Sequence, residues 1–207
     1  MRLNVVSRDV AVNNLNFHIK DLRVLRDIES YLDFYNRAMN IKNLFNFNDK
    51  VIVDVIDSLE ELSEILEVKV PKWVIGTSFE DVILILDHDK WKKSNNENVE
   101  NLILHEFVHV VLNLKTQSPL PIWLNEGLAV YLSDQYGNYK GKKPNINEDF
   151  DFYNVNYNNE KLYDISIYII MKLIDKYSIN KVIDETLKTK NFKQSKMFSN
   201  ESLLELL

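Results

Sequence analysis

The chain has 207 residues, 45% of them hydrophobic, which is enough for one domain with a sizeable buried core. Its formal net charge of −6 and the scattering of its basic residues exclude the basic patch that nucleic-acid binding requires. It contains no cysteine, so disulfides and thiolate metal ligands are excluded, and any metal must be bound by His, Asp or Glu.

The apolar runs of the chain are short. The N-terminal stretch MRLNVVSRDVAV lacks the long apolar core of a signal peptide, and the longest unbroken runs, such as VILIL, fall far short of a membrane span. We therefore expect a protein without a membrane span that is cytoplasmic as the sequence stands. A signal peptide removed ahead of residue 1 would leave no trace, so secretion stays open as the alternative.

In the first part of the chain, strand patterns alternate with helix patterns. The strand patterns occupy 9–21, 50–57, 72–78 and 80–89, and the helix patterns occupy 21–39 and 58–67. The second helix begins at SLEE, a capping-box pattern with Ser58 as N-cap. The resulting order of strand, helix, strand, helix, strand, strand predicts a small sheet with helices packed against it.

Beyond residue 89 only helix patterns occur. They cover 94–115, 121–135, 160–177, 179–190 and 199–207, and Ser94 with Glu97 forms the capping pair of the first. The segment 137–160, rich in Asn, Asp, Gly and Tyr, is predicted to be a long loop. The pattern predicts an α+β fold in one domain, 1–207, with a strand-rich lobe at 1–115 and a helical lobe at 116–207.

The stretch ENLILHEFVHVVLNLK (100–115) places two of the four histidines of the chain inside an apolar helix pattern. Residues four apart lie on one face of a helix, so the imidazoles of His105 and His109 can converge on one ion, and neutral imidazole suits zinc. Glu106 is rotated by about 100° from His105, which suits contact with a water on the metal better than ligation.

A third ligand is predicted in PIWLNEGLAVYL (121–132). If the two helices form a hairpin that turns at 116–120, His109 lies about 9 Å before the turn and Glu126 about 7.5 Å after it, so their side chains reach a similar depth. Gly127 and Ala129 would let these two helices approach closely. The alternative for Glu126 is a carboxylate favoured by the helix dipole. If HEFVH were only buried core, the protein would bind no stoichiometric metal.

These residues resemble the gluzincins, the zinc metallopeptidases that use two helical histidines and a downstream glutamate, and in particular compact bacterial peptidase MA-like domains. HEFVH with WLNEGLAVYL carries the resemblance, which covers roughly residues 50–177. It implies a zincin-like α+β fold, one Zn²⁺ bound by His105, His109 and Glu126, and Glu106 as the general base.

A further catalytic residue is implied by the same resemblance. In aminopeptidase-type gluzincins a Tyr followed three residues later by a small residue steadies the oxyanion. LYDISIYIIMKL is similar to that helix and would give the role to Tyr163, with Ser166 as the small residue, and Tyr168 as the second candidate.

The sequence departs from the family pattern at three places. The interval from Glu126 to Tyr163 is short, and the strand GTSFEDVILIL lacks the motif whose Glu holds the free amine of a peptide, so an aminopeptidase is not implied. Val130 occupies the place of the acidic residue that orients a histidine in thermolysin-like enzymes. Asn125, Ser133 or a backbone carbonyl would then support the ligands.

Together these observations predict a zinc-dependent peptidase acting on peptides or proteins through a metal-activated water. The substrate is expected to lie along DVILIL, predicted as an exposed strand edge, near a cleft that the loop 137–160 borders. A catalytically silent zincin-like binding module is the alternative. His18 and His88 receive no role, and the oligomeric state is not predicted.

Overall fold

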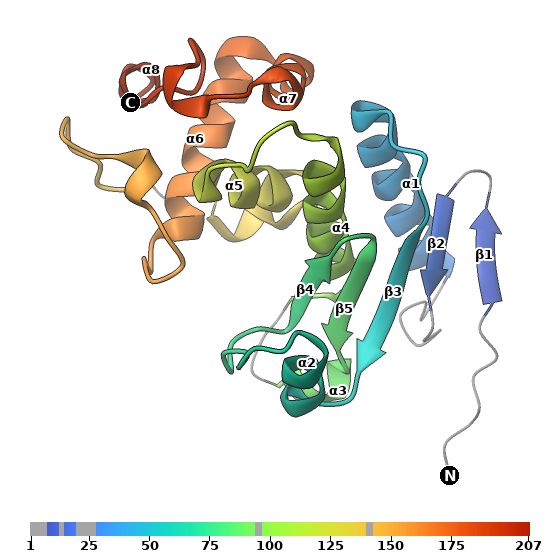
Figure 1. Ribbon diagram of the computed structural model, residues 1–207. Helices are drawn as coiled ribbons and strands as arrows, with labels where there is room; N and C mark the ends of the chain where they lie inside the picture. The colour runs from blue at the N-terminus through green and yellow to red at the C-terminus, as the bar shows by residue number, and fades with distance from the viewer. Residues whose placement is uncertain (1–7, 13–14, 20–27, 94–96, 140–142) are drawn as a thin grey trace. The chain divides into compact units, whose positions relative to one another are not determined.

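The computed structural model describes residues 8–12, 15–19, 28–93, 97–139 and 143–207 (Figure 1). The chain divides into two compact units, residues 1–110 and 111–207, and the division falls inside helix α4 (Val99–Lys115). The first unit contains the sheet and the second is helical. The α+β class and the zincin-like arrangement predicted from the sequence are confirmed.

The first unit is built on a five-stranded mixed sheet with the strand order β1-β2-β3-β5-β4. The strands are β1 (Arg8–Val12), β2 (Leu15–Ile19), β3 (Val51–Ile56), β4 (Gly76–Phe79) and β5 (Val82–Leu86). Strand β3 is parallel to both β2 and β5, whereas β1 and β4 are antiparallel to their neighbours. The segment 9–21, predicted as one strand, therefore contributes two.

The exposed edge predicted for DVILIL is wrong. This segment forms β5, which pairs with β3 on one side and with β4 on the other. Ile83 and Ile85 are 0% and 2% exposed. Strand β4, with the short sequence GTSF, lies at the edge of the sheet instead (Figure 1).

Local sequence signals explain the helices around the sheet. Helix α2 (Leu59–Ile65) begins as predicted, because the Ser58 hydroxyl accepts the Glu61 N–H at 3.1 Å, while Glu61 Oε2 accepts the N–H of Asp57. The short helix α3 (His88–Trp91), whose first residues were predicted to end a strand, has Asp87 as its N-cap, and the Asp87 carboxylate accepts the Asp89 N–H at 2.9 Å.

Two of the other predictions for this unit fall partly on residues that the structure leaves undescribed. Helix α1 spans Ile28–Phe45, so the predicted start at 21–27 lies outside the described residues and the end lies beyond residue 39. The predicted cap Ser94 also lies outside them. The side chain of Asn98 accepts the Asn101 N–H at 2.6 Å at the start of α4.

Helix α4 is fixed within the first unit by three kinds of contact. Arg37 Nη1 of α1 donates to Asn101 Oδ1 at 2.7 Å, and the rings of Phe47 and Phe107 meet edge to face. A Cβ atom on Gly76 would lie 3.0 Å from Leu102 Cδ1, so the absence of a side chain there lets β4 run close beside α4. These contacts set the helix that carries HEFVH next to the edge strand.

The second unit is a helical assembly. It contains α5 (Ile122–Leu132), η2 (Gln135–Tyr139), η3 (Phe152–Asn154), α6 (Leu162–Tyr177), α7 (Ile179–Lys188), η4 (Phe192–Gln194) and α8 (Asn200–Leu204). None of the described helices combines the length and apolar character needed to cross a bilayer.

Helices α5 and α6 pack against each other (Figure 1). Their backbones come close together at Gly127. A Cβ there would lie 2.5 Å from Ile170 Cγ1 and 2.7 Å from the carbonyl oxygen of Ser166. The nearest atoms to that Cβ belong to α6, whereas the predicted close approach to the preceding helix stays a prediction. The glycine admits α6, because only hydrogen fits against the Ser166 backbone.

The segment predicted to be a long loop, 137–160, consists of turns and irregular structure with parts of η2 and all of η3 among its described residues, and hydrogen bonds hold it in place. Tyr153 donates its hydroxyl to the carbonyl oxygen of Phe198 at 2.7 Å. The side chain of Asn200 accepts the Phe152 N–H at 2.9 Å and donates to the carbonyl of Phe150 at 2.8 Å. The segment is therefore held to the C-terminal part of the chain on its way to α6.

Candidate metal centre

Helix α4 presents His105 and His109 on one face, one turn apart. Both side chains are buried, at 8% and 9% exposure, and their rings meet edge to face with centroids 4.7 Å apart. The two Nε2 atoms lie 3.1 Å from each other. Two imidazole nitrogens therefore already face a common point.

Glu126 of α5 brings a carboxylate to the same point. It is 3% exposed, and each of the three side chains offers one ligand atom, all within 4.8 Å of one another. His105, His109 and Glu126 thus form a buried group that is able to hold a metal ion.

The donor set fits zinc. Two ligands of a tetrahedral zinc, each roughly 2.0 to 2.1 Å from the metal, are about 3.3 Å apart, close to the observed separation of the Nε2 atoms. Two nitrogens and one carboxylate oxygen are the ligands of a catalytic site that keeps its fourth position for water or substrate. Burial adds to this fit, because a cation offsets the cost of placing the carboxylate of Glu126 away from solvent.

Glu106 lies on the same helix next to His105 and is 7% exposed. It is not one of the three residues in the metal-holding group. A helix rotates by about 100° per residue, so Glu106 points to one side of the two histidines rather than between them. That position suits a base that acts beside the metal.

The two tyrosines considered for the oxyanion lie on α6. The Tyr163 ring stacks on Tyr139 with a centroid distance of 6.2 Å, and the Tyr168 ring lies 5.6 Å from Lys172 Nζ. Both are half-buried. These contacts do not bring either hydroxyl to the metal-holding group, so the oxyanion role stays a prediction.

Tyr157 contacts the group and was not selected from the sequence. Its hydroxyl donates to Glu126 Oε1 at 2.8 Å. The only feature of the sequence that could have pointed to Tyr157 was the abundance of Tyr and Asn in 137–160.

Ser133 is one of the residues that were proposed to support the metal ligands. Its hydroxyl donates to Gln135 Oε1 at 2.9 Å.

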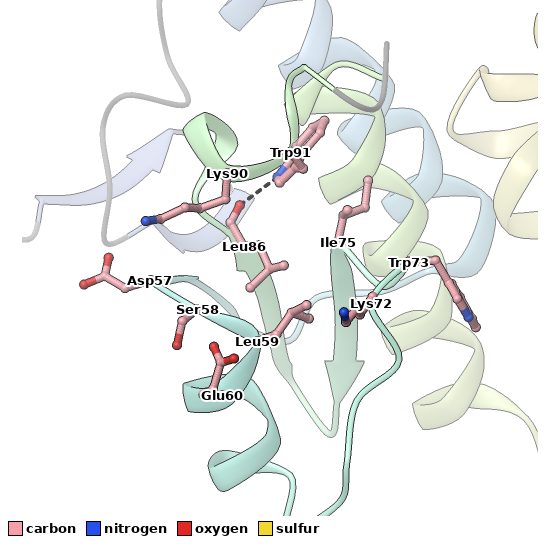
Figure 2. A pocket seen from close by; sticks show the side chains of 10 residues that line it. All are labelled: Asp57, Ser58, Leu59, Glu60, Lys72, Trp73, Ile75, Leu86, Lys90 and Trp91. Atoms are coloured by element: carbon pink, nitrogen blue, oxygen red, sulfur yellow. Dashed lines mark hydrogen bonds between the residues drawn. The ribbon is translucent and has the colours of Figure 1, made fainter.

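A separate pocket of ≈ 730 Å³ opens in the first unit, where β3 and β5 end (Figure 2). Its lining comes from β3–α2, the segment before β4, and β5–α3, and consists of Asp57, Ser58, Leu59, Glu60, Lys72, Trp73, Ile75, Leu86, Lys90 and Trp91. The buried indole of Trp91 donates to the Leu86 carbonyl at 2.9 Å (Figure 2), whereas Trp73, which also lines the pocket, is 63% exposed. None of the three metal-holding residues lines this pocket.

Comparisons with known proteins agree with this geometry. A family model described as "Peptidase family M1 domain" matches residues 28–201. A search of curated proteins and a search of solved structures each find no match.

Proposed function

Because the chain belongs to peptidase family M1, a gluzincin family, we propose that it is a zinc-dependent peptidase that hydrolyses peptide bonds through a metal-activated water. The observation that carries the proposal is the buried group of His105, His109 and Glu126, whose ligand atoms lie within 4.8 Å of one another. These three residues would bind one Zn²⁺. When bound, zinc supplies a Lewis acid that lowers the pKa of water towards about 7 and polarises the scissile carbonyl.

Two side chains are proposed to carry out proton transfer and to stabilise the charge that develops on the substrate. Glu106 accepts a proton from the attacking water as the C–O bond forms, and then gives that proton to the amine as the C–N bond breaks. Tyr163 is proposed to donate a hydrogen bond to the carbonyl oxygen as negative charge develops on it.

Strand β4 is proposed as the site where the substrate backbone binds. The Leu86 N–H donates to the Ile75 carbonyl at 2.9 Å, so Ile75 is a hydrogen-bonded position of the β4–β5 ladder. Such positions alternate along an antiparallel ladder, so the backbone N–H and C=O groups of Gly76 and Ser78 face away from β5. An extended peptide can pair with these groups while lying beside α4.

The first experiment combines metal analysis with peptide cleavage. The native protein is expected to contain about one zinc per chain, as the three-ligand group requires. It is expected to cleave members of a peptide library, and a chelator is expected to abolish the cleavage. Glu106→Gln should retain the zinc and lose about 10²- to 10⁴-fold in kcat, because the general base is removed.

Glu100→Gln is the matched control, since it neutralises another carboxylate on α4 and should leave cleavage unchanged. A zinc-loaded Glu106→Gln protein that cleaves at the native rate would contradict the assignment of the base. A native protein that binds zinc but cleaves nothing would instead support the alternative of a silent binding module.

A further inference from the structure

The hydrogen bond between Tyr157 and Glu126 joins a surface residue to a buried one. Tyr157 is 52% exposed, whereas Glu126 is 3% exposed, and the hydroxyl lies 2.8 Å from Oε1. The ring therefore lies at the surface while its polar end reaches the carboxylate that completes the metal-holding group. A hydrogen bond to a charged acceptor is among the stronger hydrogen bonds in proteins.

The geometry of a glutamate explains what this bond can do. Rotation of the carboxylate about its last torsion is soft and roughly two-fold, so burial alone does not select which oxygen faces a ligand. A donor fixed on Oε1 selects one orientation of the carboxylate within the metal-holding group. Hydrogen bonds of this kind from the residues behind the ligands tune metal affinity in other sites.

The backbone around Tyr157 is suited to hold the hydroxyl in place. Asn156 Oδ1 accepts the Asn158 N–H and Asn159 Oδ1 accepts the Lys161 N–H, both at 2.9 Å. The first of these side-chain-to-backbone turns contains the tyrosine, and the second leads directly into α6. These local turns restrict the backbone beside the ring, and the contacts of the same segment with Phe198 and Asn200 place it in the second unit.

We propose that Tyr157 is a positioning residue that holds the carboxylate of Glu126 in the orientation in which it ligates the metal. This inference rests on the proposed function, because it assumes that Glu126 is a metal ligand. A bond that only tethers the segment 155–161 would affect the stability of the second unit and leave the affinity for zinc unchanged.

The test measures the zinc dissociation constant by competition with a chromophoric chelator, at one pH and with no substrate present. Tyr157→Phe keeps the exposed ring and removes only the hydroxyl, and it should bind zinc about 10- to 100-fold more weakly. Tyr153→Phe is the matched control, because its hydroxyl bonds to the Phe198 carbonyl in the same segment. The control should leave the dissociation constant unchanged even if it lowers the melting temperature.

A second pair of variants separates positioning from general loosening. In a Glu126→Ala background the carboxylate is gone, so adding Tyr157→Phe should change the residual zinc affinity no further. An equal loss in both backgrounds, or an unchanged affinity in the single variant, would overturn the inference. A native protein that binds no zinc would overturn the proposed function instead, so the two failures are distinguishable.

Discussion

At the scale of single residues, the three candidate ligands are held by different means. His105 and His109 are fixed by a buried helix, on which β-branched and leucine neighbours leave the imidazoles little freedom to turn. Glu126 has a longer and softer side chain, and Tyr157 supplies the contact that a helix backbone does not. The Nε2 atoms of the two histidines face each other at 3.1 Å.

The role proposed for Tyr163 is tested by removing its hydroxyl. Tyr163→Phe should lower kcat by about 10²- to 10³-fold, as loss of one oxyanion donor does, with little change in KM or zinc content. Tyr168→Phe is the matched variant on the same helix and should retain native kcat, since its ring lies against Lys172. If Tyr168→Phe alone lost activity, the oxyanion role would pass to Tyr168.

Some residues of the candidate site could be predicted from the sequence, and others could not. The pair His105 and His109 could be predicted because helical spacing alone places residues four apart on one face. Glu126 could be predicted because it lies in a short helix that follows directly. Tyr157 could not, because its position depends on how residues 143–160 are held to Phe198 and Asn200, which no local pattern encodes.

At the scale of elements, strand β4 and helix α4 form the part of the first unit where we propose that the substrate backbone binds. Gly76 allows them to lie close together, and β4 keeps its outer side open among the described strands. The wrong prediction for β5 has a physical explanation. A continuous apolar run is typical of a strand buried on both faces, which is an interior strand, whereas the polar GTSF fits an edge.

A proline at position 78 tests whether the substrate backbone pairs with the outer edge of β4. Ser78→Pro removes an N–H that faces away from β5, so the ladder within the sheet should survive and the backbone pairing with substrate should be lost. We expect kcat/KM to fall by at least about tenfold, the equivalent of a net hydrogen bond of ~1.4 kcal/mol, with zinc content unchanged. Ser78→Ala keeps the N–H and should cleave like the native protein.

One result for Ser78→Pro would contradict the proposed pairing of substrate with β4. If Ser78→Pro folds, binds zinc and cleaves with native kcat/KM, the substrate does not pair with β4 at that position. Circular dichroism and metal analysis of both variants establish whether the fold and the site are intact.

At the scale of the whole molecule, the order of strands and helices was predictable because each element carries its own periodicity and end signals. From β3 to α8 the predicted helices and strands are present, but β4 begins at Gly76 rather than at residue 72, and α3 and the short helices η2, η3 and η4 were not predicted. Pairing was harder to predict, because which strand lies at an edge depends on contacts between distant segments rather than on the pattern of one segment.

Metal binding should stabilise the folded chain. A ligand that binds only the folded state adds about 4 kcal/mol when its free concentration is 1,000 times Kd, which raises Tm by roughly 10 °C for a chain of this size. We expect calorimetry of the native protein to show such a shift between chelator and zinc. Glu126→Ala should shift far less at the same zinc concentration, and an equal shift would mean that Glu126 is not a ligand.

The positions of the three tryptophans allow their fluorescence to report on different parts of the chain. Trp123 is the only tryptophan after residue 110, and it is fully buried between the rings of Phe152 and Phe198. Its emission should therefore be blue-shifted, whereas the exposed indole of Trp73 should be readily quenched by iodide. With Trp73 and Trp91 changed to Phe, fluorescence would follow the melting of the helical half by itself.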